Sequence, residues 1–116
     1  MNTAVYKYSF PHLQDEATFE MSSASTVVHT GLQGDTVCIW AHVQTDDDSA
    51  KVNRRFILRG TGEPLPTTGL YQHVGSFMIN DGEFVFHVFE DWGNTINGIV
   101  QNVNDAYGAL KIEENG

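Results

Sequence analysis

The chain has 116 residues, of which 41% are hydrophobic, and its 15 acidic and 6 basic residues give a formal net charge of −9. This length suits one domain and is too short for two domains with separate cores. A strongly acidic surface repels nucleic acid, so direct binding to DNA or RNA is not expected. The same charge suits a protein that stays soluble, or one that imitates nucleic acid toward a basic partner.

Cysteine content and the N-terminal sequence bear on the compartment. Cys38 is the single cysteine, so no intrachain disulfide can form, which suits a reducing compartment or a virion assembled in one. No run approaches the roughly 20 apolar residues of a membrane span, and the first residues lack the order of a signal peptide. We therefore expect a cytosolic protein with no targeting segment and no membrane partner.

Alternation of apolar and polar residues dominates the first half of the chain. This period of two predicts five strands, over residues 3–10, 16–21, 26–32, 36–44 and 52–59. Pro11 ends the first strand because proline cannot donate a hydrogen bond to a neighbouring strand. The segment Gln33-Gly34-Asp35 predicts a hairpin turn between the third and fourth strands.

Two further strands and a second hairpin follow. The apolar runs 70–79 and 84–90 flank Asn80-Asp81-Gly82, residues that tolerate the positive φ of a tight turn. The second run is aromatic and β-branched on both faces, which indicates a central strand covered on both sides. The segment 60–69 holds three glycines and two prolines and therefore predicts a long loop.

The composition changes after Glu90. Apolar residues recur there at helical spacing, which predicts one C-terminal helix. The predicted fold is therefore mainly β, an antiparallel sandwich or open barrel of about seven short strands with one C-terminal helix. A β domain would span 1–90, and a helical extension over 91–116 would pack on it or on a partner. The helical stripe is also the candidate oligomer surface, formed by Trp92, Ile96, Ile99, Val100, Val103 and Tyr107.

Three segments carry a family resemblance. They are 37–43 (Val-Cys-Ile-Trp-Ala-His-Val), 56–65 (Phe-Ile-Leu-Arg-Gly-Thr-Gly-Glu-Pro-Leu), and 71–77 running on to 84–90 (Phe-Val-Phe-His-Val-Phe-Glu). In their order and spacing, the chain from Val5 to Glu90 resembles a family of small proteins of unknown function that are common in tailed phages and prophages. The resemblance implies a phage origin, with action in the host cytoplasm or, alternatively, in the virion. It supplies no catalytic or binding residues.

Motifs that would indicate catalysis or metal binding are weak. Cys38, His42, His73 and His87 could form a metal site across adjacent strands, but no Cys-x-x-Cys or His-x-x-x-His spacing supports zinc. The run 46–48 lacks the alternation and the closing glutamate of an EF-hand loop. The chain has no Gly-x-Ser-x-Gly elbow and no complete phosphate-binding loop. We therefore expect no enzyme activity, no cofactor and no metal.

A basic strip interrupts the acidic sequence. Lys51, Arg54, Arg55 and Arg59 are four of the six basic residues. On a strand, Arg55 and Arg59 share one face and Arg54 lies on the other. The strip could meet an acidic partner, but ion pairing with the neighbouring aspartates of 46–48 is the simpler interpretation.

Three functions of different classes remain. The first is a small acidic phage-encoded protein-interaction module that inhibits a host defence or nucleic-acid-handling protein by charge mimicry. Its partner-binding residues would be acidic groups near strand ends: Asp46, Asp47, Asp48, Glu63, Glu90 and Asp91. The second is a virion-associated decoration or structural protein that binds coat protein and forms a homo-oligomer. The third is a small-ligand-binding protein with a pocket between the sheet and the 60–69 loop, lined by Trp40, His42 and His87.

Overall fold

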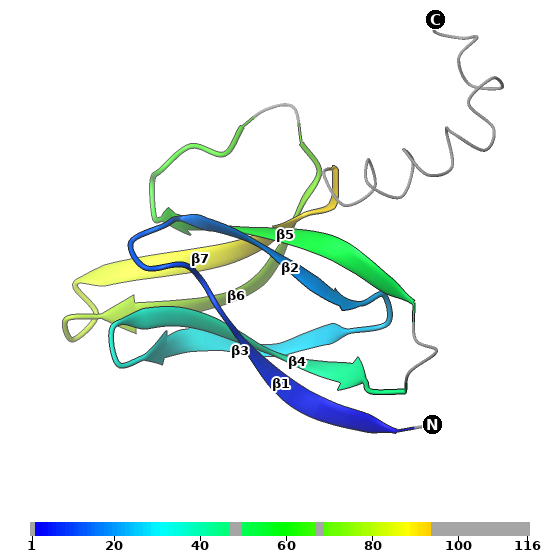
Figure 1. Ribbon diagram of the computed structural model, residues 1–116. Helices are drawn as coiled ribbons and strands as arrows, with labels where there is room; N and C mark the ends of the chain where they lie inside the picture. The colour runs from blue at the N-terminus through cyan, green and yellow to red at the C-terminus, as the bar shows by residue number, and fades with distance from the viewer. Residues whose placement is uncertain (1, 47–49, 67–68, 94–116) are drawn as a thin grey trace, which may run out of the picture.

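The computed structural model describes residues 2–46, 50–66 and 69–93. Within these residues the chain forms seven strands in two antiparallel sheets (Figure 1). The strands are β1 (Thr3–Ser9), β2 (Glu16–Ser22), β3 (Thr26–Gln33), β4 (Thr36–Gln44), β5 (Lys51–Gly60), β6 (Tyr71–Ile79) and β7 (Phe84–Asp91). No helix in the described part is long and apolar enough to cross a membrane.

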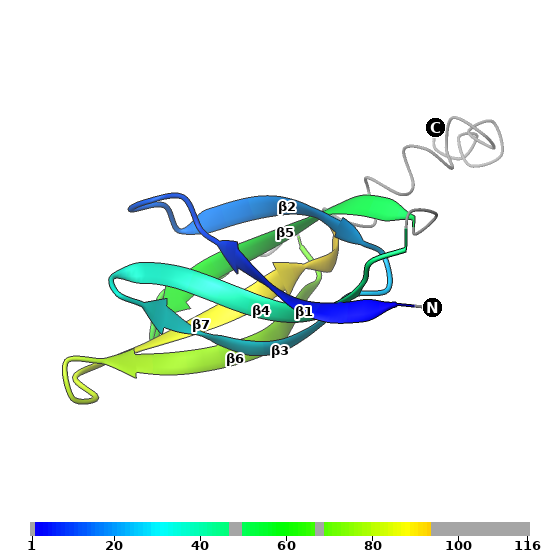
Figure 2. The same cartoon turned by 60° about the horizontal axis from the view of Figure 1, so that its bottom comes forward.

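The two sheets form a sandwich-like open arrangement (Figure 2). The three-stranded sheet has the order β1-β4-β3, and the four-stranded sheet has the order β2-β5-β7-β6. The structure therefore confirms a mainly-β fold with sandwich-like packing, in which β4 and β7 are inner strands as expected. The predicted C-terminal helix, with its stripe from Ile96 to Tyr107, lies outside the described residues and stays a prediction.

Strand positions and turns follow the sequence pattern closely. Each observed strand begins and ends within one residue of its predicted range. The β3–β4 turn contains Gly34 at a φ of 64°. The β6–β7 turn contains Asn80, Asp81 and Gly82 at φ values of 52°, 54° and 88°. These are residue types that adopt left-handed backbone at low cost, which explains why both hairpins form where expected.

The core lies between the sheets. Ile39, Ala41 and Val43 of β4 face Phe56 of β5 and Val88 of β7, and all five are buried. At the side where β1 approaches β2, the ring of Phe19 lies 5.4 Å from Tyr8, 6.0 Å from Phe10 and 5.9 Å from Phe56. Burial of each large apolar side chain contributes about 1.5–3 kcal/mol, so these contacts hold the two sheets together.

The outer face of β7 is covered less completely than the sequence predicts. Val85, His87 and Phe89 are half-buried there. Thr61, which follows β5, donates its backbone N–H to the Val85 carbonyl at 3.0 Å, and its hydroxyl lies 2.8 Å from His87 Nε2. The segment after β5 therefore shields part of this face.

At the edge of the sandwich away from β1 and β2, the edge strands β3 and β6 lie side by side (Figures 1 and 2). Each contains a β-bulge, between Val27 and His29 in β3 and between His73 and Gly75 in β6. At Gly75 the two strands lie so close that a Cβ atom would be 2.8 Å from Cγ2 of Thr30 and closer still to its Oγ1. Glycine fits here because a side chain would clash with Thr30, which is buried between the strands.

We expect Gly75→Ala to lower the free energy of unfolding by about 1–3 kcal/mol, the usual effect of overpacking a buried contact. Thr30→Ala removes the two side-chain atoms nearest the new methyl, so the double variant should regain part of the loss. Urea denaturation followed by circular dichroism measures all four proteins. Equal effects of Gly75→Ala with and without Thr30→Ala would contradict this contact.

Candidate functional site: an apolar groove at one end of the sandwich

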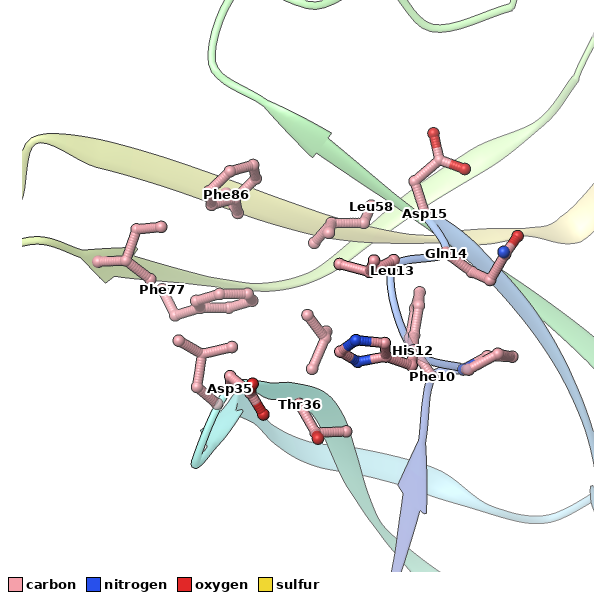
Figure 3. Close-up of a pocket in the computed structure, with 14 residues that line it drawn as sticks. Phe10, His12, Leu13, Gln14, Asp15, Asp35, Thr36, Leu58, Phe77 and Phe86 are labelled. Atoms are coloured by element: carbon pink, nitrogen blue, oxygen red, sulfur yellow. The ribbon is translucent and has the colours of Figure 1, made fainter.

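An apolar groove of about 430 Å³ opens at one end of the sandwich, between the two sheets (Figure 3). It is built from four separate parts of the chain: the β1–β2 connection, the β3–β4 turn, the end of β5, and the β6–β7 hairpin. Its apolar lining consists of Phe10, Pro11, Leu13, Leu32, Val37, Leu58, Phe77, Ile79 and Phe86. A cavity of this size and lining is typical of a site that takes apolar groups.

Aromatic residues of β6 and β7 fix one wall of the groove. Phe77 and Phe86 are directly opposite each other in the strand register, and their rings stack at 6.0 Å. The Phe86 ring also lies within 3.5 Å of the position that a Cβ atom on Gly60 would take. Such cross-strand aromatic pairs are rigid, so this wall is preformed.

Leu13 stands at the rim of the groove in an unfavourable state (Figure 3). Its φ is 60°, in the left-handed region, and its side chain is 89% exposed. A branched aliphatic residue in this conformation costs about 1–2 kcal/mol, and its exposure leaves apolar surface in water. Backbone strain of this kind clusters at binding and catalytic sites, so Leu13 marks this end as a candidate site.

Two carboxylates give the rim of the groove a negative character. Asp15 and Asp35 both line it. Asp15 lies 3.6 Å from Arg59, but its side chain is largely exposed and the pair is weak. A binding partner with basic groups beside an apolar group would therefore match both the apolar lining and the acidic rim of the groove.

The structure corrects part of the predicted acidic partner-binding surface. Glu90 is 1% exposed, and its two carboxylate oxygens accept hydrogen bonds from Arg54 at 2.6 and 2.8 Å. Asp91 is also buried and accepts a hydrogen bond from Arg55 at 2.5 Å. Both side chains are engaged inside the fold, because β7 carries them onto the two faces of the four-stranded sheet. They are not presented to a partner.

The remaining predicted acidic residues lie at separate places. The Glu63 carboxylate accepts a hydrogen bond from the backbone N–H of Gly60 at 2.6 Å. The Asp46 carboxylate accepts one from the backbone N–H of Asn2 at 3.1 Å. Asp47 and Asp48 lie outside the described residues. The acidic groups of the apolar groove, Asp15 and Asp35, were not among those that the sequence singled out.

The three arginines of the basic strip form ion pairs within the described residues. Arg54 pairs with Glu90, Arg55 with Glu16 and Asp91, and Arg59 with Asp15. Burial lowers the pKa of Arg55, but hydrogen bonds to Glu16 and Asp91 outweigh that effect and raise the pKa above its ordinary value. As predicted, Arg54 lies on one face of β5, and Arg55 and Arg59 lie on the other. Arg54 is on the buried face.

The predicted ligand-pocket residues do not come together. Trp40 and His42 belong to β4 in the three-stranded sheet, where the Trp40 ring packs 5.2 Å from His29. His87 belongs to β7 in the four-stranded sheet, and its Nδ1 lies 2.7 Å from the Ser76 hydroxyl. Across 2–46, 50–66 and 69–93, no group of three or more His, Cys, Asp or Glu is placed to hold a metal ion.

In a comparison with protein-family models, the chain matches a domain of unknown function, DUF7352, over residues 1–97. No curated protein and no solved structure matches the chain. The family match covers the whole described β-sandwich. It carries no statement about a phage origin, which stays a prediction.

We expect Glu90→Gln to be strongly destabilising, by about 3–5 kcal/mol, because it leaves the Arg54 guanidinium buried without a counter-charge. The double variant Arg54→Met with Glu90→Leu removes both charges and should recover most of that loss. Urea denaturation at neutral pH measures both. Similar losses in the single and double variants would show that packing, and not the unpaired charge, is responsible.

We expect Leu13→Asn to raise the free energy of unfolding by about 0.5–1 kcal/mol, because asparagine tolerates left-handed backbone. Leu13→Ala is the matched control, since it shortens the side chain and keeps the unfavourable φ. Thermal denaturation compares the two with the unaltered protein. A higher melting temperature for Leu13→Ala than for Leu13→Asn would contradict the role of backbone strain.

Proposed function

We propose that this chain, which belongs to the DUF7352 family, is a protein-interaction module that binds an apolar segment of a partner in its end groove. The partner segment carries one or two large apolar side chains flanked by lysine or arginine. The observation that carries this proposal is Leu13, held exposed on a strained backbone beside a preformed apolar groove.

The apolar part of the proposed contact follows from the energetics of interfaces. A few buried apolar or aromatic anchors supply most of the binding energy in protein complexes. The groove offers a rigid aromatic wall at Phe77 and Phe86, and Leu13 would lose its exposed apolar surface when a partner covers it. Binding would thus gain free energy from a group that the free protein leaves in water.

The charge of the chain supports a basic partner. The formal net charge is −9, and the groove itself carries Asp15 and Asp35. Long-range attraction would raise the association rate with a basic partner and weaken as salt screens the charges. An isolated apolar site without this charge would give no such salt dependence.

The same chemistry supports the first of the three functions considered above. A nucleic-acid-handling protein exposes basic side chains around the groove that takes its nucleic acid. We propose that an acidic module with an apolar anchor could occupy such a groove as an inhibitor, in a host cell if the chain comes from a phage. The alternative role in a virion, with coat protein as partner, predicts a different captured protein in the same experiments.

The direct test is a selection of peptides from a random library on the immobilised protein, followed by fluorescence anisotropy on the selected peptides. Enriched peptides should combine a large apolar residue with flanking Lys or Arg, and their affinity should fall as salt rises from 50 to 500 mM. Leu13→Asn should weaken binding about tenfold or more. Val28→Asn is the matched control, because Val28 is also an exposed aliphatic residue but lies outside the groove.

Selection of acidic or purely polar peptides would contradict the proposal, as would equal effects of the two variants. Affinity capture from a cell lysate at low and high salt then identifies the natural partner. Capture of coat protein, retained at high salt, would favour the virion role over inhibition of a nucleic-acid-handling protein.

A further inference from the structure

A second cavity, polar in character, opens at the other end of the sandwich. Its volume is about 330 Å³. It lies where β3 and β6 begin, whereas the apolar groove lies where these strands end. The bulges of β3 and β6 fall beside it, at Val28 and Val74. We call this cavity the polar cleft; its polar lining includes Ser25, Thr26, Arg54, Gln72 and Glu90.

One group in the polar cleft lacks a hydrogen-bond partner. Ser25 is 7% exposed, and its hydroxyl is the buried side-chain oxygen without a partner among the described residues. Its backbone carbonyl is engaged, because it accepts a hydrogen bond from Nη1 of Arg54 at 2.7 Å. A buried hydroxyl left unpaired is unfavourable, so this oxygen is a position that a bound molecule can satisfy.

The wall of the polar cleft is rigid. The Arg54 guanidinium lies 5.5 Å from the Trp92 ring centre and holds Glu90 through two hydrogen bonds. Trp92 is fixed in turn, because its indole N–H donates to Oε1 of Gln72 at 2.6 Å. That bond leaves the amide N–H groups of Gln72 available as donors.

The wall is also electrically balanced and mixed in hydrogen-bonding character. The charges of Arg54 and Glu90 cancel, so the lining has no excess charge that would favour an anion or a cation. It offers donors from Arg54 and Gln72, and hydroxyls at Ser25 and Thr26 that both donate and accept. One side of the Trp92 ring is occupied by Arg54, which disfavours the stacking of a planar base on that side.

From this combination we infer that the polar cleft binds a neutral hydroxyl-rich molecule of the monosaccharide class. A hydroxyl group donates and accepts at once, so it matches a neutral lining that contains both donors and acceptors. The C–H groups of such a ring can lie against the aliphatic and aromatic edges that Val27, Val74 and Trp92 contribute. The small volume suits a single ring and excludes a long chain.

Ligand-observed saturation-transfer NMR on the full chain tests this inference, with D-glucose, D-galactose, D-mannose and N-acetyl-D-glucosamine as probes. At least one should bind with a dissociation constant in the millimolar range and shift the indole N–H signal of Trp92. Ser25→Ala should weaken that binding about fivefold to tenfold. Because the hydroxyl has no partner among the residues that the structure describes, the same variant should melt at an unchanged or higher temperature.

Leu13→Asn is the control at the opposite end and should leave sugar binding unchanged, which separates this inference from the proposed function. Binding that is lost in Ser25→Ala and kept in Leu13→Asn supports the polar cleft as a sugar site. Absence of saturation transfer from all four probes overturns the inference. So does equal binding by Ser25→Ala, or tighter binding of inorganic phosphate or adenosine than of any sugar.

Discussion

The buried ion pair between Arg54 and Glu90 is the interaction on which the arrangement of this sandwich depends. It joins β5 to β7 from inside the core, and Arg54 extends the link to the β2–β3 connection through the carbonyl of Ser25. Burying two charges is unfavourable unless both are fully hydrogen-bonded, so each partner requires the other. The pair therefore acts as a constraint on strand register, since a shift of β7 by one residue would place Glu90 on the outer face.

Around this constraint the two ends of the sandwich differ. At the end of the ion pair, the lining is polar, and Trp92 and Gln72 are locked to it by hydrogen-bonding and ring contacts. At the other end the stacked rings of Phe77 and Phe86, both in the four-stranded sheet, form one wall of an apolar groove. The core between the ends is filled by buried apolar side chains, among them Ile39, Phe56 and Val88. One polar and one apolar site can thus coexist in a small domain without sharing residues.

Features of this fold that depend on residues close together in the sequence could be predicted, whereas features that depend on distant segments could not. The seven strands and both hairpins are local consequences of alternation and turn residues, which is why their positions are predicted almost without error. The roles of Glu90 and Asp91 are misread when both are treated as acidic groups at a strand end. The alternation of side chains along each strand gives the missing signal. Glu90 lies on the same face of β7 as buried Val88, and Arg54 lies on the same face of β5 as buried Phe56. The end groove could not be predicted, since it is assembled from four segments whose proximity is set by the packing of the sheets.

Leu13 and Ser25 show how the two candidate sites relate to the stability of the fold. Each is unfavourable for the fold taken alone: Leu13 combines left-handed backbone with an exposed apolar side chain, and Ser25 has a buried hydroxyl with no partner in the described part. Neither feature is needed to form the strands, because the core contacts of Phe56, Ile39 and Val88 are complete without them. Sequences keep local rules where folding alone decides the residue, and departures concentrate where binding also matters. The position of one departure at each end, both beside a cavity, is therefore better explained by two binding sites than by imperfect packing.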